Sequence, residues 1–192
     1  LLLPLYTMTM STGEYGIADL LNNISDLILP ILTLCISDAV FRFSMSDDTN
    51  SKEVLIIGLK LINVGSILIF IIGLFSYLVF KFKYSMLLVF IYIFKSYNNL
   101  FSNYTRGIGK SKLFVINGIM GAFNICIFSY LLLNIFNLGI YGYCVAIIIA
   151  NFICCAFLII SLKLWPLGKN KSINKELLKT MIIYSAPLVT NA

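Results

Sequence analysis

The chain has 192 residues, of which 60% are hydrophobic and only 11% are charged, and its mean hydropathy is +0.97. A water-soluble domain of this composition would lack the polar surface that it needs, so the composition excludes a soluble globular protein. The sequence contains no histidine, which excludes a histidine base, a histidine metal ligand and a histidine proton relay.

Long apolar runs follow one another along the chain and predict membrane-spanning helices, because a span needs about 20 predominantly apolar residues. The predicted helices cover residues 1–10, 17–43, 54–80, 84–104, 113–136 and 140–164, and a further helix begins at 177. The predicted fold class is therefore all-α, a polytopic transmembrane helical bundle. Leu1 is not a methionine, and Ala192 follows soon after Pro187 in an apolar segment, so we expect a chain truncated at both ends.

One segment between the apolar runs is longer than the others. Residues 165–176 include Pro166, Gly168 and several lysines, a composition typical of a flexible, basic cytoplasmic linker. We expect this linker to join an N-terminal transmembrane lobe of six helices, residues 1–164, to the start of a second lobe at residues 177–192.

The positions of Lys and Arg orient the predicted bundle, because short loops rich in these residues stay in the cytoplasm. With the turn around Ser11 outside, the outer loops hold only Lys81 and Lys83. The inner segments hold most of the fourteen Lys and Arg residues, namely Arg42, Lys52, Arg106, Lys110, Lys112, Lys163, Lys169, Lys171, Lys175 and Lys179. The net charge of +6 then reflects topology and contact with anionic headgroups, not binding of nucleic acid.

The second predicted helix carries more polar residues than contact with lipid on all sides would allow. Asp19, Asn22, Asn23 and Asp26 recur at helical spacing and predict one polar stripe on its outer half. Pro30 removes a backbone donor near the middle of this helix, so we expect a kink there.

Asp38 and Arg42 are four residues apart at the predicted cytoplasmic end of the same helix. Side chains at this spacing can form an ion pair along one helix face, which would close the helix at the interface. A cytoplasmic gate or a contact with an anion is an equally good interpretation of the two residues.

Two lysines lie inside predicted helices, where an unpaired charge costs about 2.5 to 3.5 kcal/mol. Lys60 either reaches the headgroups from near the end of its helix or faces a cavity. Lys95 lies near the middle of the fourth predicted helix and precedes the polar residues Asn98 and Asn99. We predict that Lys95 lines a hydrated cavity, in preference to forming a buried pair with Asp26.

Small residues and cysteines in the apolar runs predict packing. Gly142, Ala146, Ala150 and Cys154 recur every four residues, a stripe that lets helices approach closely. The five cysteines lie in apolar runs without metal-type spacing, so we expect free packing thiols. We find no phosphate-binding glycine loop, no nucleophile with a base and no cluster of metal ligands in the sequence, so we do not expect an enzyme.

Four motifs in chain order resemble those of one family of membrane transporters. They are residues 4–7 with 11–16, residues 38–43, residues 104–110 and residues 184–188. They resemble, respectively, the first outer turn, the end of the second helix, the turn after the fourth helix and the start of the seventh helix. The family is that of the O-antigen and capsular polysaccharide repeat-unit flippases, in the superfamily of multidrug, oligosaccharidyl-lipid and polysaccharide exporters.

The resemblance implies two six-helix lobes around a central cavity, with this chain supplying most of the first. It implies alternating access that moves an undecaprenyl-diphosphate-linked oligosaccharide across the bacterial cytoplasmic membrane. The implied partners are this lipid-linked oligosaccharide, membrane lipids, a polysaccharide polymerase and glycosyltransferases. No cofactor is implied apart from a coupling proton or sodium ion.

On this resemblance, the candidate substrate-binding residues are those that can neutralise diphosphate or hydrogen-bond to sugar. They are Lys95, Lys60, Arg42, Arg106, Asn98 and Asn99. The candidates for ion coupling or gating are Asp26, Asp38 and Asp19. A cation-coupled multidrug or metabolite antiporter of the same superfamily and an inactive truncated remnant are the alternatives.

Overall fold

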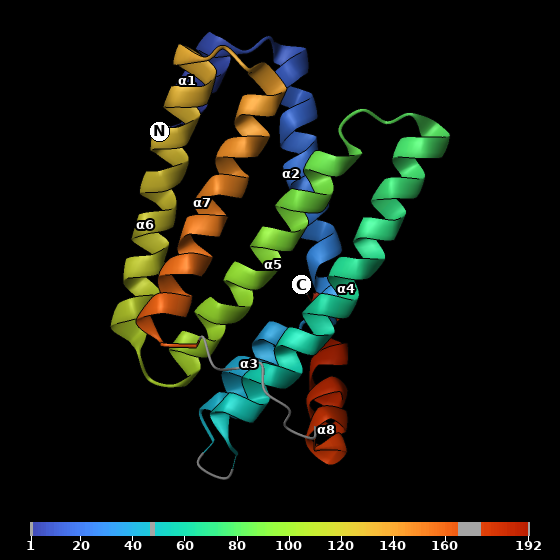
Figure 1. Cartoon of the computed structure of the whole chain (residues 1–192), viewed down its shortest axis with the longest axis vertical. Helices are drawn as coiled ribbons and strands as arrows, with labels where there is room; N and C mark the ends of the chain where they lie inside the picture. Colours follow the sequence, from blue (N-terminus) through green and yellow to red (C-terminus); the bar gives the residue numbers. More distant parts are fainter. Residues whose placement is uncertain (1, 47–48, 165–173, 192) are drawn as a thin grey trace.

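The computed structural model describes residues 2–46, 49–164 and 174–191, and all regular structure in these ranges is helical (Figure 1). The helices are α1 (Leu3–Thr9), α2 (Thr12–Thr33), α3 (Ile36–Ser44), α4 (Ser51–Phe80), α5 (Ser85–Gly107), α6 (Ser111–Tyr130), α7 (Gly139–Ser161) and α8 (Lys175–Ser185). A π-helical turn (Leu131–Ile135) follows α6, and a 3-10 helix (Ala186–Asn191) follows α8. The predicted all-α class is confirmed for the described ranges.

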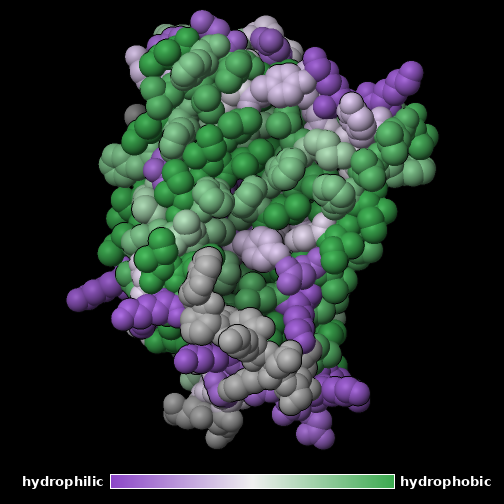
Figure 2. Space-filling model, viewed as in Figure 1, coloured by the Kyte–Doolittle hydropathy of each residue, from purple (hydrophilic) through white to green (hydrophobic). Residues whose placement is uncertain are grey.

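Three helices are long and apolar enough to cross a membrane, namely α4, α6 with its π-helical turn, and α7. The bent pair of α2 and α3 would be a fourth span. Large apolar side chains such as Ile67 and Phe75 of α4 and Phe123 of α6 are exposed on the outside of the bundle. Figure 2 shows a broad hydrophobic surface with polar side chains gathered toward its two ends. These features indicate a membrane protein.

Helix α5 has 23 residues, long enough for a span, but it is not apolar enough to count as one. It contains Lys95 and several amides, which lower its hydropathy. It packs against α2, α3, α4, α6 and α7, so its neighbours shield these polar residues from lipid. The predicted lobe of six membrane-spanning helices therefore stays a prediction.

The second predicted helix, residues 17–43, is wrong as a single element. It starts earlier, because the Ser11 hydroxyl accepts from the Glu14 N–H while the Glu14 carboxylate accepts from the Ser11 N–H, which forms a capping box. It is also interrupted at Leu34 and Cys35, whose φ angles of 50° and 51° are left-handed, and α2 and α3 meet there at 60°.

The bend does not lie at Pro30, where the sequence predicted a kink. Pro30 is inside α2, and its carbonyl accepts hydrogen bonds from the N–H groups of both Leu34 and Cys35. A left-handed residue after a helix commonly ends it in this way, by pairing its last carbonyls. The direction of the chain therefore changes one turn after the proline. The other predicted helices agree with the observed ones to within about one turn.

Successive long helices run in opposite directions (Figure 1). The turns at 81–84 and 136–138 lie at the same end of the bundle as the start of α2, whereas the end of α3, the start of α4 and the turn at 108–110 lie at the other end. Gly109, with a φ of 74°, allows the tight turn between α5 and α6. This alternation is the one that the charge pattern requires, and the assignment of one end to the cytoplasm stays a prediction.

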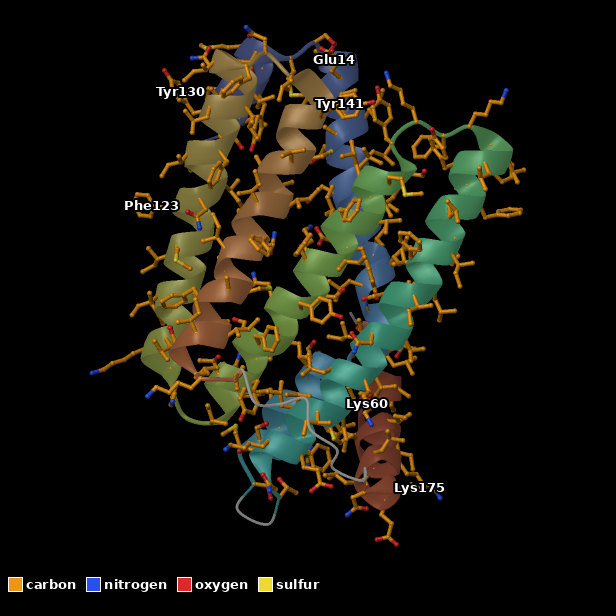
Figure 3. The ribbon with its side chains drawn as sticks, viewed as in Figure 1. Glu14, Lys60, Phe123, Tyr130, Tyr141 and Lys175 are labelled. Carbon is orange, nitrogen blue, oxygen red and sulfur yellow. The ribbon has the colours of Figure 1, made fainter. Side chains whose placement is uncertain are left out.

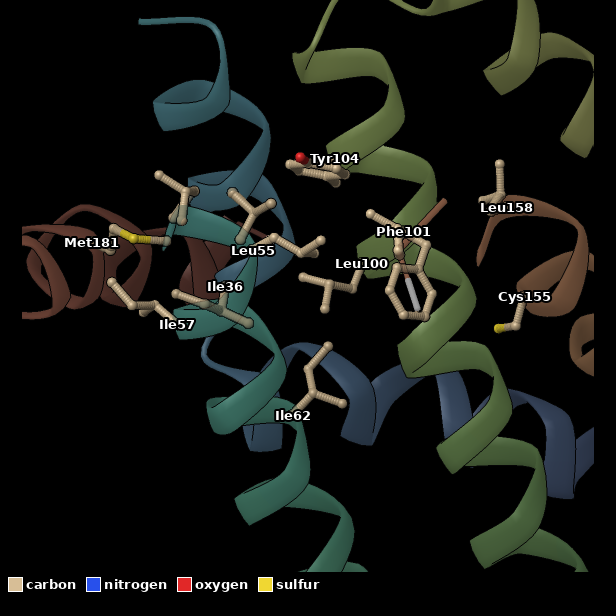
Figure 4. Packing of buried hydrophobic residues seen from close by; sticks show 14 residues of the cluster. Ile36, Leu55, Ile57, Ile62, Leu100, Phe101, Tyr104, Cys155, Leu158 and Met181 are labelled. Atoms are coloured by element: carbon tan, nitrogen blue, oxygen red, sulfur yellow. The ribbon is translucent and has the colours of Figure 1, made fainter. Parts of the chain in front are cut away.

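The largest buried cluster lies at the end of the bundle that holds α3 and α8 (Figure 4). Ile36, Leu55, Leu100 and Met181, from α3, α4, α5 and α8, are fully buried in it. Helix α8 thus shares the core of the bundle, while the predicted division into two lobes stays untested. Residues 165–173 of the predicted linker lie outside the described residues, and its last two residues already belong to α8.

The predicted packing stripe on α7 is confirmed, because Gly142, Ala146, Ala150 and Cys154 are all buried. The five cysteines are free thiols, as predicted. Cys126 is exposed on α6, however, so the expectation that all five serve packing holds only for the other four.

Candidate functional site

Lys95 of α5 is bonded to two side chains of α2. Its Nζ donates to Asp26 Oδ1 at 2.6 Å and to Asn22 Oδ1 at 2.8 Å. The Lys95 side chain is 16% exposed and that of Asp26 is 54% exposed, so the pair lies at a surface with its carboxylate toward the open side. It is the only ion pair within the described ranges.

A groove lined by polar side chains passes along this pair. Around Lys95 it is a cavity of about 400 Å³ whose walls include Asp26, Asn98, Asn99 and Asn151. A second cavity, of about 220 Å³, shares Asp26 and Asn99 with the first and reaches Asp38.

A third cavity, of about 420 Å³, lies toward α6. It shares Asn98, Ser102 and Asn151 with the cavity around Lys95. Because neighbouring cavities have wall residues in common, we treat the three as one feature, termed the polar groove. It extends from the amides between α5, α6 and α7, past Lys95, to the first turn of α3.

The sequence set a cavity-lining Lys95 against a buried pair with Asp26, and the structure combines the cavity with a pair that is not buried. Lys95 lines the polar groove, and it also pairs with Asp26. The two arrangements are compatible, because a half-exposed carboxylate can form the pair on the wall of the groove without being buried.

In the predicted polar stripe of α2, hydrogen bonds join side chains that are four residues, or about one turn, apart. Asn23 Nδ2 donates to Asp19 Oδ2 at 3.0 Å, and Asn22 Nδ2 donates to Asp26 Oδ2 at 3.4 Å. Asp26 belongs to the walls of the polar groove, whereas Asp19, two turns earlier, does not. Of the two, Asp26 is therefore the stronger candidate for ion coupling.

Three asparagines join α5, α6 and α7. Asn117 Nδ2 donates to Asn98 Oδ1 at 3.0 Å, and Asn98 Nδ2 donates to Asn151 Oδ1 at 3.0 Å. Asn151 Nδ2 then donates to the Ile147 carbonyl at 2.9 Å. Asn99, the other predicted amide, lines the groove and accepts from Asn103 Nδ2 at 3.0 Å.

Asn151 is a groove residue that was not predicted from the sequence. It is the only amide in the apolar run that forms α7, and an amide in such a helix needs a partner on a neighbouring helix. That signal was present in the sequence, but the partner could not be read from it.

Three predicted cationic residues lie away from the walls of the polar groove. Lys60 is exposed on the lower half of α4 (Figure 3). The Arg42 guanidinium lies 4.5 Å from the ring centre of Tyr184, and that of Arg106 lies 3.9 Å from the ring centre of Phe41. Both arginines are exposed, at the end of the bundle that holds α3 and α8.

The predicted ion pair between Asp38 and Arg42 is wrong, because the described residues show no such contact. Asp38 lies in the first turn of α3, where the partial positive charge of the helix N-terminus stabilises a carboxylate, and it lines the polar groove. Arg42 instead stacks on Tyr184 of α8.

Comparison with protein-family models, curated proteins and solved structures gives no match for this chain. Function must therefore be argued from the polar groove itself. Its described residues contain no group of three or more acidic residues or cysteines that could hold a metal ion. A lysine flanked by neutral amides suits the binding of an anionic group with hydrogen-bonding substituents.

Proposed function

We propose that this protein moves an undecaprenyl-diphosphate-linked oligosaccharide repeat unit across the bacterial cytoplasmic membrane, for the assembly of a surface polysaccharide. The observation that carries the proposal is the position of Lys95, paired with Asp26 on the wall of a polar groove within an apolar helical bundle. Ionisable residues inside membrane helices are costly, and most mark the path of a substrate or an ion.

The pair of Lys95 and Asp26 suits a diphosphate cargo, because the cargo can exchange with the carboxylate. Diphosphate oxygens accept charge-assisted hydrogen bonds from an ammonium, as a carboxylate does. Asp26 is 54% exposed and can leave Lys95 for water without being buried unpaired. The released carboxylate could then take up a proton or a sodium ion, which would couple cargo binding to an ion gradient.

The residues outside the groove have accessory roles in this proposal. Arg42 and Arg106 are exposed at the end that we assign to the cytoplasm, where they attract the anionic cargo head. Lys60 contacts anionic headgroups. A second lobe completes the cavity, glycosyltransferases supply the cargo and a polymerase consumes it on the outer side.

The half-exposed carboxylate of Asp26 also suits an organic cation, so the antiporter is the second candidate. Both can be tested with the protein reconstituted into liposomes. We expect transbilayer movement of a fluorescent undecaprenyl-diphosphate trisaccharide above that in protein-free liposomes, and no ion-driven uptake of ethidium. The reverse result would favour the antiporter, and movement of neither compound would favour an inactive remnant.

A further inference from the structure

The part of the polar groove between α5, α6 and α7 differs chemically from the part around Lys95. Its described wall residues are all uncharged. Asn98, Ser102, Asn117 and Asn151 supply polar atoms, while small and apolar residues form the remainder, among them Ala122, Ile125 and Ala150. We term this cavity the amide pocket.

In the amide pocket each asparagine donates a hydrogen bond to the next group in a chain, and one buried acceptor remains without a donor within the described ranges. Asn117 donates to Asn98, which donates to Asn151, which donates to a backbone carbonyl. At the start of this chain, Asn117 is only 3% exposed, and its Oδ1 has no hydrogen-bond partner among the described residues. A buried acceptor without a donor is unfavourable, so the site favours a molecule that brings one.

The ligand that fits must donate hydrogen bonds and carry no charge. Nothing on the described walls would compensate a buried charge, so a phosphate or a carboxylate is disfavoured. Hydroxyl and acetamido groups donate to an amide oxygen, and the apolar walls can cover the C–H face of a sugar ring.

We infer that the amide pocket binds the uncharged sugar ring next to the diphosphate, while Lys95 binds the diphosphate. The two subsites must be adjacent, because Asn98, Ser102 and Asn151 belong to the walls of both cavities. The inference rests on the proposed function and assigns it a sugar subsite. It makes recognition of the sugar separable from recognition of the lipid diphosphate.

The test compares two radiolabelled ligands on the purified full chain in detergent, undecaprenyl diphosphate and undecaprenyl-diphosphate N-acetylglucosamine. We expect the wild-type Kd to be about tenfold lower for the ligand with the sugar, the gain expected of one or two neutral hydrogen bonds. In Asn117→Leu and Asn151→Leu the ratio of the two Kd values should fall to about one. Asn124→Leu is the matched control, since Asn124 is a half-buried amide of α6 outside the pocket walls.

The ratio of the two Kd values distinguishes a loss of sugar recognition from misfolding, because a misfolded variant would lose binding of both ligands alike. Equal wild-type Kd values would overturn the sugar subsite and leave the proposed function standing. A ratio retained in both Asn117→Leu and Asn151→Leu would place the sugar elsewhere and also overturn the inference. Failure of the wild type to bind either ligand would overturn the proposed function itself.

Discussion

The Nζ of Lys95 lies 2.6 Å from Oδ1 of Asp26, so an ion pair joins α5 to α2 well inside both helices. Lys95 also holds Asn22 of α2, which donates in turn to Asp26. The ammonium therefore organises a small network on the wall of the polar groove. Any ligand that binds Lys95 must compete with this network.

Removing Lys95 or Asp26 alone should lower the free energy of unfolding by more than the net stabilisation that the ion pair contributes, because the remaining charge loses its partner. For Lys95→Met or Asp26→Asn alone we expect a loss of about 1 to 2 kcal/mol in the free energy of unfolding. The double variant should lose less than the sum, with a coupling of about 1 kcal/mol. Unfolding in mixed detergent micelles with increasing SDS measures these differences. Asp19→Asn removes a carboxylate whose one hydrogen-bonded side-chain partner in the described ranges is Asn23, so it should show no coupling to Lys95→Met.

Gly107 allows α5 to pass close to α3. A Cβ built at this position would lie 2.8 Å from the Phe41 carbonyl oxygen and 2.8 Å from Ser44 Cβ. Gly107→Ala should therefore separate the helices and cost about 1 to 3 kcal/mol. At Gly16 of α2 a Cβ would meet no described atom within 4 Å, so Gly16→Ala should gain up to about 1 kcal/mol through helix propensity. Equal effects of the two variants in SDS unfolding would contradict the close approach.

Met181 anchors α8, since it is fully buried in the largest core cluster. Met181→Ala should cost about 2 to 5 kcal/mol of packing and release α8 from α3. We expect faster amide hydrogen exchange in α8, with α7 unchanged. The neighbouring exposed Lys179→Ala serves as the control. If Met181→Ala left the rate of amide hydrogen exchange in α8 unchanged, burial of Met181 would not be what holds α8 against α3.

The helices could largely be predicted from the sequence, because long apolar runs and polar turns set their limits. The bend between α2 and α3 could not. Pro30 was the visible signal, yet the chain turns at Leu34 and Cys35, residue types that rarely adopt a left-handed backbone. The environment of α5 was also beyond sequence reasoning, since its neighbours, not its own hydropathy, keep it from lipid.

The candidate site was predictable in chemistry but not in pairing. The cost of an ionised lysine inside a helix pointed to Lys95, and helical spacing predicted the stripe that includes Asp26. The two residues are 69 positions apart, and only the packing of α2 on α5 brings them together. The same reason explains Asn151, whose partner Asn98 is 53 positions away. Spacing within one helix predicted the pair of Asp38 and Arg42. That prediction failed because Asp38 lies on the groove wall at the start of α3, while Arg42 stacks on Tyr184 of α8.

The distribution of lysines predicts which end of the bundle faces the cytoplasm. Lys52→Cys and Lys110→Cys place thiols at one end, and Lys83→Cys places one at the other, all at exposed positions. In a Cys126→Ser background the remaining native thiols are buried. A membrane-impermeant maleimide should label Lys83→Cys in intact spheroplasts, and the other two only after permeabilisation. The opposite pattern would invert the topology.

The central claim is that Lys95 binds the diphosphate of a lipid-linked cargo, and its most direct test is the rate of transbilayer movement in proteoliposomes. The fluorescent undecaprenyl-diphosphate trisaccharide is the cargo, and wild type, Lys95→Ala and Lys60→Ala are compared at equal protein content. Loss of charge-assisted hydrogen bonds should lower the rate roughly ten- to hundredfold in Lys95→Ala. Lys60→Ala, which removes a lysine outside the groove walls, should stay within about twofold of wild type. A Lys95→Ala protein that is normally folded and moves the cargo at the wild-type rate would contradict the account.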